Sequence, residues 1–293
     1  MGRVAAGVAA AVLLALVAAA CGERSEPTGA GTELYPVTVA SPTGGKPLVV
    51  RTPAKRIAVI APSVERILDA VGAGKAVAGM PLAQNKTVDV ARLRALRPDL
   101  IVASSTTDDQ TLAQAARAVR GVPVYQAPDD SIRGVEETIT DLGVITAHQA
   151  AATRLVREIE RKRATVRTHL ARSRAVTVFL TTAFFNSLAT FQTVSNQSLP
   201  GDLLREAGGH NVAGNATELD ASQLLRLDPR WVIATSDSDT TLTKLLGSKA
   251  VKKLAALRDS RFATIDAHLL EPGPKIGEGL LVLAKRLHPD AFR

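Results

Sequence analysis

Hydrophobic and polar residues alternate along this chain in two series, separated by one long amphipathic segment. From residue 56, short apolar runs (56–61, 76–80 and 99–105) alternate with helical runs, and the same alternation restarts after residue 173. Strands that alternate with helices pair in parallel through helical crossovers. An opening hairpin is expected around 44–45, where two glycines separate two β-rich runs. The pattern therefore predicts two doubly wound α/β lobes.

The separating segment predicts a single long helix. About 26 residues after Gly143 contain neither glycine nor proline and would span roughly 40 Å. Its apolar positions fall near one face: Ala152, Val156, Ile159, Val166 and Leu170. The basic residues lie largely off that face: Arg154, Arg157, Arg161, Lys162 and Arg163. They indicate either a nucleic-acid or lipid patch or a solvated helix face, and we favour the solvated face.

One phrase occurs twice. "LRALRPDLIVASS" (93–105) and "LLRLDPRWVIATS" (224–236) align without a gap, including Pro98 and Pro229. Each copy predicts a helix that stops before its proline and a strand that follows. We interpret the copies as equivalent units of two facing lobes, each delivering the serine-containing end of its strand to a shared cleft.

Ligands of open α/β sheets lie beyond the carboxyl ends of the strands. The segments that follow the predicted strands therefore supply candidate ligand-binding residues, with Ser63 also expected to cap the helix that it begins. These candidates are Pro62, Ser63, Pro81, Lys86, Ser105, Phe184, Phe185, Asn196, Asp237, His268 and Lys275.

The N-terminus has the pattern of a secretory signal. Arg3 precedes seventeen apolar or small residues, and Cys21 follows three alanines, as in a bacterial lipobox in which the cysteine is diacylated. The alternatives are a short membrane anchor or a plain signal with an incidental cysteine. The expected organisation is a signal peptide (1–20), a lipidated tether (21–34), an N-terminal lobe (35–143), a linker helix (144–172) and a C-terminal lobe (173–293).

Composition narrows the function. Of the 293 residues 46% are hydrophobic and 22% charged, which suits a folded core, and the net charge of +8 favours anionic partners. Nucleic acid is not expected as a partner, because zinc-ligand spacing and helix-turn-helix signatures are missing from the sequence. The five histidines are scattered, and nucleophile elbows, phosphate loops and zinc-protease motifs are also missing. We therefore expect a binding protein with no catalytic residue, metal site or cofactor.

Five segments in series resemble the periplasmic-binding-protein family for iron–siderophore complexes and vitamin B12. They are 53–80, 93–105, 203–214, 223–236 and 262–292, and the likeness extends from Tyr35 to the end. The resemblance implies an α/β fold of two Rossmann-like lobes with mostly parallel sheets, a single long helix joining them and the ligand cleft between. It also implies delivery to an ABC permease and its ATPase by an extracytoplasmic protein, lipid-anchored to the cell membrane and expected to be a monomer.

The family places a permease-docking glutamate on each lobe. The corresponding positions here hold Ala91 and Arg205, and the neighbouring acids Asp89 and Glu206 are the candidate substitutes. As ligand we favour an anionic ferric chelate held by Lys86 and Lys275. Cobalamin, stacking on Phe184 and Phe185, and haem, with Tyr125 or His268 as axial ligand, are the alternatives. An enzyme with two facing Rossmann-like lobes, such as a glycosyltransferase, and a scaffold lipoprotein are the rivals from other classes.

Overall fold

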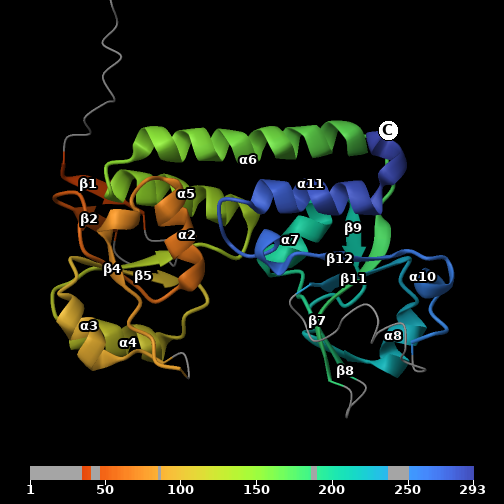
Figure 1. Cartoon of the computed structure of the whole chain (residues 1–293), viewed down its shortest axis with the longest axis horizontal. Coiled ribbons are helices and arrows are strands. Elements are labelled where there is room, and N and C mark those ends of the chain that lie inside the picture. The colour runs from red at the N-terminus through yellow and green to blue at the C-terminus, as the bar shows by residue number, and fades with distance from the viewer. Residues whose placement is uncertain (1–34, 41–46, 85–86, 186–189, 237–250) are drawn as a thin grey trace, which may run out of the picture. The chain divides into compact units, whose positions relative to one another are not determined.

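The computed structural model describes residues 35–40, 47–84, 87–185, 190–236 and 251–293, without the side chains of Phe184 and Phe185. Glu33–Arg293 forms one compact unit, shown in Figure 1. The chain enters it through β1 (Val37–Val39), which pairs antiparallel with β2 (Leu48–Val50). This pairing confirms the expected opening hairpin.

The first sheet is wholly parallel. Its order is β4-β3-β5-β6, made of β3 (Ile57–Val59), β4 (Val77–Gly79), β5 (Leu100–Ser104) and β6 (Val124–Ala127). The associated helices are α2 (Pro62–Ala70), α3 (Val90–Leu96), α4 (Asp109–Ala118) and α5 (Ile132–Ile145), with a short 3₁₀ turn η1 (Gly74–Ala76) before β4. Every residue of β3 is buried, as expected for a central strand covered on both faces. The prediction of a doubly wound parallel lobe is confirmed.

The second sheet is mixed. Its order is β10-β8-β7-β11-β12, with β9 pairing β7. The strands are β7 (Val176–Phe185), β8 (Thr190–Thr193), β9 (Gly209–Asn211), β10 (Glu218–Asp220), β11 (Trp231–Thr235) and β12 (Phe262–Ile265). Three pairs, β7 with β9, β7 with β11 and β11 with β12, are parallel, whereas β8 pairs antiparallel with β7 and β10.

The antiparallel part adds to the predicted alternation of strands and helices. The segment after the first predicted strand of the C-terminal lobe was expected to line the ligand cleft, and in the structure β7 continues to Phe185 and β8 pairs beside it. Phe191 of β8 is fully buried and packs edge-to-face on Phe179 of β7, with ring centroids 5.9 Å apart. Burial of this aromatic pair stabilises the hairpin, which the sequence pattern did not predict because most residues around the pair are polar.

The remaining helices are α7 (Leu199–Glu206), α8 (Ala221–Leu227), α10 (Ala255–Arg258) and α11 (Ile276–Leu287), with 3₁₀ turns η2 (Ala267–Leu269) and η3 (Pro289–Phe292). The sequence pattern over 249–258 predicts a helix, yet within the described part of that range the helix begins only at Ala255. Leu254 is extended, and Ala255 N–H donates to the Asp228 carboxylate at 2.9 Å, which fixes the helix start there.

The repeated phrase folds as two equivalent units, α3–β5 and α8–β11. Each helix begins at an aspartate, because Asp89 accepts the Arg92 amide at 3.0 Å and Asp220 accepts the Gln223 amide at 2.7 Å. Each helix also ends on a residue with positive φ just before its proline. Because each aspartate lies four residues before its copy of the phrase, the equivalence of the two units extends beyond the aligned sequence.

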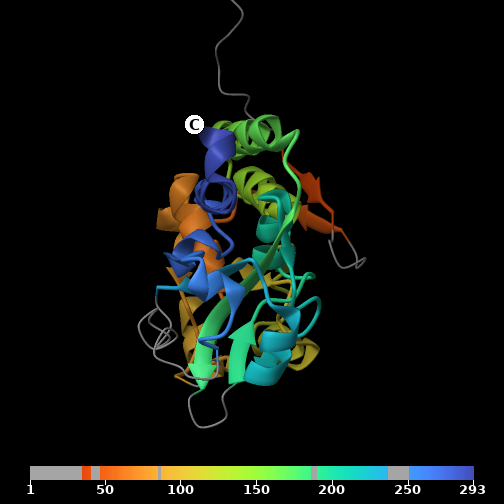
Figure 2. The same ribbon diagram turned by 90° about the vertical axis from the view of Figure 1, so that its right-hand side faces the viewer.

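The long helix is α6 (Gln149–Leu170), whose 22 residues span about 33 Å. It is shorter than expected because the chain turns at Ala147, where φ is 60°, before the helix starts. α6 packs on both α5 and α11 (Figures 1 and 2). Gly143 and Gly277 permit this approach, since a Cβ on either would lie within 3.1 Å of an α6 backbone or Cβ atom. The helical layer also shares one continuous apolar core with both sheets.

Candidate ligand-binding site

A pocket of about 260 Å³ brings together parts of the chain that lie 200 residues apart. Arg66 of α2 contributes one side, and the loop between β12 and α11 contributes the rest. The lining residues are Arg66, Asp266, His268, Leu269, Gly273, Pro274 and Lys275. The predicted candidates His268 and Lys275 thus line the same pocket. They follow the carboxyl end of β12, which is where ligands of open α/β sheets lie.

Local contacts within the loop of this pocket, and its packing against the core, fix its conformation. The Asp266 carboxylate accepts the His268 amide at 3.0 Å, and this contact starts η2. A Cβ on Gly279 would lie 2.0 Å from the Leu269 carbonyl oxygen, so only glycine permits this contact between α11 and the loop. Leu270 and Ile276 are buried on either side of the loop, which fixes its ends in the core.

Charged groups surround the pocket. Arg66 forms an ion pair with Glu271, and the His268 Nδ1 atom lies 3.3 Å from the same carboxylate. Lys275 is exposed and forms no ion pair with any residue that the structure describes. Arg66 is a functional candidate that the sequence reasoning missed. Its spacing from Ser63 would have indicated it, because residues three apart in a helix share a face.

Other predicted ligand contacts are engaged elsewhere. The hydroxyls of Ser104 and Ser105 both donate to Asp129 Oδ1 at 2.8 Å, and Asp129 is only 6% exposed. Pro81 is buried and its carbonyl accepts the Asp89 amide at 2.9 Å. Asn196 is exposed, and its backbone N–H donates to the Gly214 carbonyl at 2.8 Å.

Some candidates change role and others are not described. The helix α2 is capped by Ala61 without a side-chain hydrogen bond, so Ser63 lies inside the helix and Pro62 occupies its first position. The expectation that Ser63 caps this helix was therefore wrong. Lys86, Asp237 and the side chains of Phe184 and Phe185 lie outside the described residues.

Tyr125 is unsuited to the axial role considered for haem. Its side chain is 2% exposed, and its hydroxyl donates to Asp141 Oδ2 at 2.8 Å. Burial raises the pKa of this hydroxyl, and the neighbouring carboxylate adds to the effect. The ring is part of the core of the first sheet, so His268 remains as the candidate from that pair.

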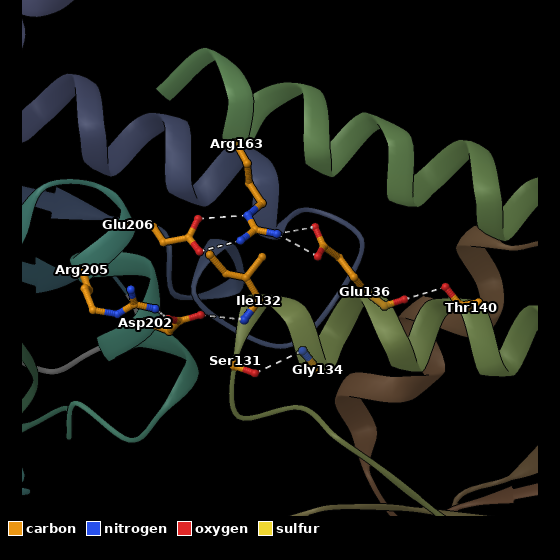
Figure 3. A network of polar contacts seen from close by, with 9 residues as sticks. All are labelled: Ser131, Ile132, Gly134, Glu136, Thr140, Arg163, Asp202, Arg205 and Glu206. Carbon is orange, nitrogen blue, oxygen red and sulfur yellow. Dashed lines mark hydrogen bonds and ion pairs between the residues drawn. The ribbon is translucent and has the colours of Figure 1, made fainter. Parts of the chain in front are cut away.

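A second polar cluster joins three helices (Figure 3). Arg163 of α6 donates to both oxygens of Glu206 on α7, at 2.9 and 2.6 Å, and to both oxygens of Glu136 on α5, at 3.1 and 2.9 Å. The side chains are 22%, 18% and 12% exposed, respectively. We call these three residues the Arg163 cluster. It connects helices that follow different sheets.

Burial sets the electrostatics of this cluster. It raises the pKa of Glu136 even though the Arg163 charge lowers it, so desolvation of that carboxylate is only partly offset. Hydrogen bonds to Glu206 raise the pKa of Arg163, against the opposing effect of burial. A neighbouring contact adds to the connection, since Asp202 Oδ2 of α7 accepts the Ile132 amide at the start of α5 at 2.9 Å. Asp202 also pairs with Arg205.

These contacts bear on the expected docking acids. Both oxygens of Glu206 are held by Arg163, and Asp89 caps α3. Docking of a permease by these two acids stays a prediction, and each acid has a structural contact of its own. Arg205, at the second of the two expected docking positions, is exposed and pairs with Asp202.

The part of the chain that the structure describes offers no metal centre, since it holds no group of three or more histidine, cysteine or acidic side chains placed for an ion.

An open groove of about 1070 Å³ follows α6, lined by that helix and Ala70. It is wider than the pocket at Arg66, but one helix supplies nearly all of its wall. We therefore take the pocket at Arg66, His268 and Lys275, called the Arg66 pocket, as the candidate ligand site. Among the described helices, none has the length and apolar character needed to cross a membrane.

Comparison with known proteins identifies the class. The periplasmic binding protein family matches residues 54–269, and the chain belongs to that family. Members of this family bind solutes and are not enzymes, in agreement with the catalytic motifs missing from the sequence. No curated protein sequence matches the chain.

Solved structures agree on the fold. The chain is similar to the periplasmic heme-binding protein RhuT from Roseiflexus sp. RS-1, at 18% identity over 81% of this chain and 99% of that one, with a TM-score of 0.68. It is also similar to the vitamin B12 binding protein BtuF of Vibrio cholerae, at 16% identity over 82% and 99%, TM-score 0.68. Helicobacter pylori CeuE with bound Ni(II) gives 15% identity over 87% and 90%, TM-score 0.73. At these identities the likeness establishes the fold alone.

Proposed function

We propose that this chain is the substrate-binding component of an ABC importer and that it captures an anionic ferric chelate of the siderophore type. The observation that carries the proposal is the placement of Arg66 and Lys275 in one pocket formed by α2 and the loop before α11. Guanidinium and ammonium groups bind the charged oxygens of such chelates through charge-assisted hydrogen bonds.

Binding exchanges one anion for another. In the free protein Glu271 pairs with Arg66. An incoming chelate offers several anionic oxygens, and it replaces Glu271 as the partner of Arg66 while also reaching the exposed Lys275. Because the ion pair is about 40% exposed on both sides, its rupture costs little.

The protein works outside the cytoplasm in this proposal, tethered by a diacylated Cys21. The support is the sequence pattern of residues 1–21 and the family's solute-binding role. Replacing Cys21 with serine tests the anchor, because the parent should incorporate a labelled fatty acid and the variant should not. Equal labelling of the two proteins, or no label in either, would contradict lipidation at Cys21.

A ligand panel tests the proposed substrate. We expect thermal unfolding to shift upward with a hydroxamate or catecholate ferric siderophore, and to stay unchanged with haem, cobalamin and the iron-free chelator. The single tryptophan, Trp231, begins β11 at the end opposite to the cleft, so unfolding is a better readout than its fluorescence. A shift with haem or cobalamin alone would replace the proposed ligand, and a response to none of them would contradict solute capture.

A further inference from the structure

The positive charge of this protein is concentrated on one segment. Residues 149–174, which contain α6, hold eight Lys or Arg and two Glu, a net charge of +6 out of +8 for the whole chain. The other 267 residues are therefore close to neutral. On an ordinary solvated face the two signs are mixed in similar numbers, whereas this segment carries a strong excess of positive charge.

The inner and outer cations of α6 differ in their contacts. Arg163 is held by Glu136 and Glu206, and Lys162 pairs with Glu158 at 2.7 Å. Arg154, Arg157 and Arg161, which we call the basic face, form no ion pair with any residue that the structure describes. Their spacing of three and four residues places them on one side of the helix.

This side of α6 is exposed and mostly basic, and the two acids of the helix, Glu158 and Glu160, lie at its edges. Its successive positions are Ala150, Arg154, Arg157, Arg161, Thr165 and Thr168, and all six are exposed. The opposite side is buried through Ala152, Ile159 and Val166 against α5 and α11. Arg172 and Arg174, also exposed, continue the positive charge beyond the helix. The result is an exposed ridge along a helix about 33 Å long, with its positive charge centred on residues 154–161.

The course of the chain brings this ridge near the expected anchor. Tyr35, the first described residue, donates its hydroxyl to the Val144 carbonyl at 2.6 Å, in the last turn of α5 and just before α6 begins. Residues 21–34 extend at most about 50 Å, which exceeds the length of α6. A lipid on Cys21 would thus leave the whole ridge within reach of the bilayer.

We propose that the basic face of α6 lies against the anionic phospholipid headgroups of the membrane to which the protein is tethered. The contact orients the protein on the bilayer, and it leaves the ligand site open, because no residue lining the Arg66 pocket belongs to α6. The proposal rests on the extracytoplasmic, membrane-tethered location given above. It does not depend on which ligand is bound.

The test measures membrane binding without the lipid. The chain from residue 21 with Cys21→Ser retains the whole compact unit Glu33–Arg293. We expect it to co-sediment at low salt with vesicles of phosphatidylglycerol and phosphatidylcholine, and added salt should release it. It should not bind vesicles of phosphatidylcholine alone. Each arginine near an anionic surface strengthens binding about fivefold, so R154Q/R157Q/R161Q should bind about 100-fold more weakly.

A matched variant separates a specific face from general charge. R92Q/R117Q/R120Q removes three exposed arginines from α3 and the α4 region with the same change in net charge, and should bind like the parent. Thermal unfolding of both variants is the folding control. Because the substituted side chains are exposed, it should match that of the parent. Equal weakening by the two variants, equal binding to neutral vesicles, or no binding at all would overturn the proposal. A negative result in the ligand panel or in the Cys21→Ser labelling would not change the outcome expected with vesicles, so the failures can be told apart.

Discussion

The guanidinium of Arg163 on α6 donates two hydrogen bonds, 2.9 and 2.6 Å long, to the carboxylate of Glu206 on α7. The same guanidinium also donates to Glu136 on α5. A bidentate guanidinium–carboxylate pair fixes orientation as well as distance. Here it joins the helix that precedes β7 to the helices α5 and α7, and the Asp202–Ile132 contact lies beside it. The two sheets are therefore connected by side-chain contacts between helices as well as by the single long helix, and we expect these contacts to keep any movement between the sheets small.

Replacing Arg163 with methionine should destabilise the protein by about 2 kcal/mol, because two largely buried carboxylates lose their cation. Urea unfolding measures the change. Arg157→Met, on the exposed side of the same helix, should change stability by less than about 0.5 kcal/mol. Equal effects of the two substitutions would contradict the importance of the cluster.

Asp141 should make stability depend on pH. Burial raises its pKa to about 6 from the ordinary value of 3.8, although the hydrogen bond from Tyr125 lowers it. A raised folded-state pKa favours the protonated carboxyl, so this contribution is present in full below about pH 4 and lost as pH rises through about 6.

Asp141→Asn keeps an acceptor for Tyr125 and removes the titration. Because the carboxyl is partly exposed, we expect the stability of the parent relative to this variant to fall by about 1 kcal/mol between about pH 4 and about pH 7. Urea unfolding at several pH values measures it. A difference that stays constant with pH would show that Asp141 titrates normally.

Asp89 allows its capping role to be separated from permease docking. Asp89→Asn retains an N-cap acceptor for the Arg92 amide, whereas Asp89→Ala removes it and should cost about 1 kcal/mol of stability. Asp220→Ala, at the equivalent position, should cost a similar amount.

Uptake then tests docking. If Asp89 docks the permease through its charge, Asp89→Asn should lower ligand uptake in cells while ligand binding and stability stay at parental levels. Normal uptake by this variant would leave Asp89 as a helix cap alone.

The Arg66 pocket predicts opposite effects for two neighbouring charges. Arg66→Gln should weaken binding of an anionic ferric chelate about tenfold or more, because a charge-assisted hydrogen bond contributes about 1.5–3 kcal/mol. Glu271→Gln should strengthen it, since the carboxylate that competes for Arg66 is removed. Isothermal titration calorimetry measures both. Weaker binding in both variants would mean that the ion pair serves the loop and not the ligand.

Much of the fold could be predicted from local pattern. The parallel lobe, the opening hairpin, the long helix and the equivalence of the two repeated units follow from periodicity, turn residues and prolines, which act over a few residues. The antiparallel hairpin β7–β8 and the late start of α10 could not, because they depend on the burial of Phe191 and on Asp228 reaching Ala255.

The same division holds for the functional residues. By itself the sequence determined the family resemblance, the loop with His268 and Lys275, and the basic residues of the long helix. Only the tertiary structure decided that Arg66 completes their pocket, that Ser105 and Glu206 are already engaged, and that Arg163 is paired while Arg157 is not. Periodicity places a side chain on a face, but the partner of a charge is set by helices 27 and 43 residues away that pack beside it.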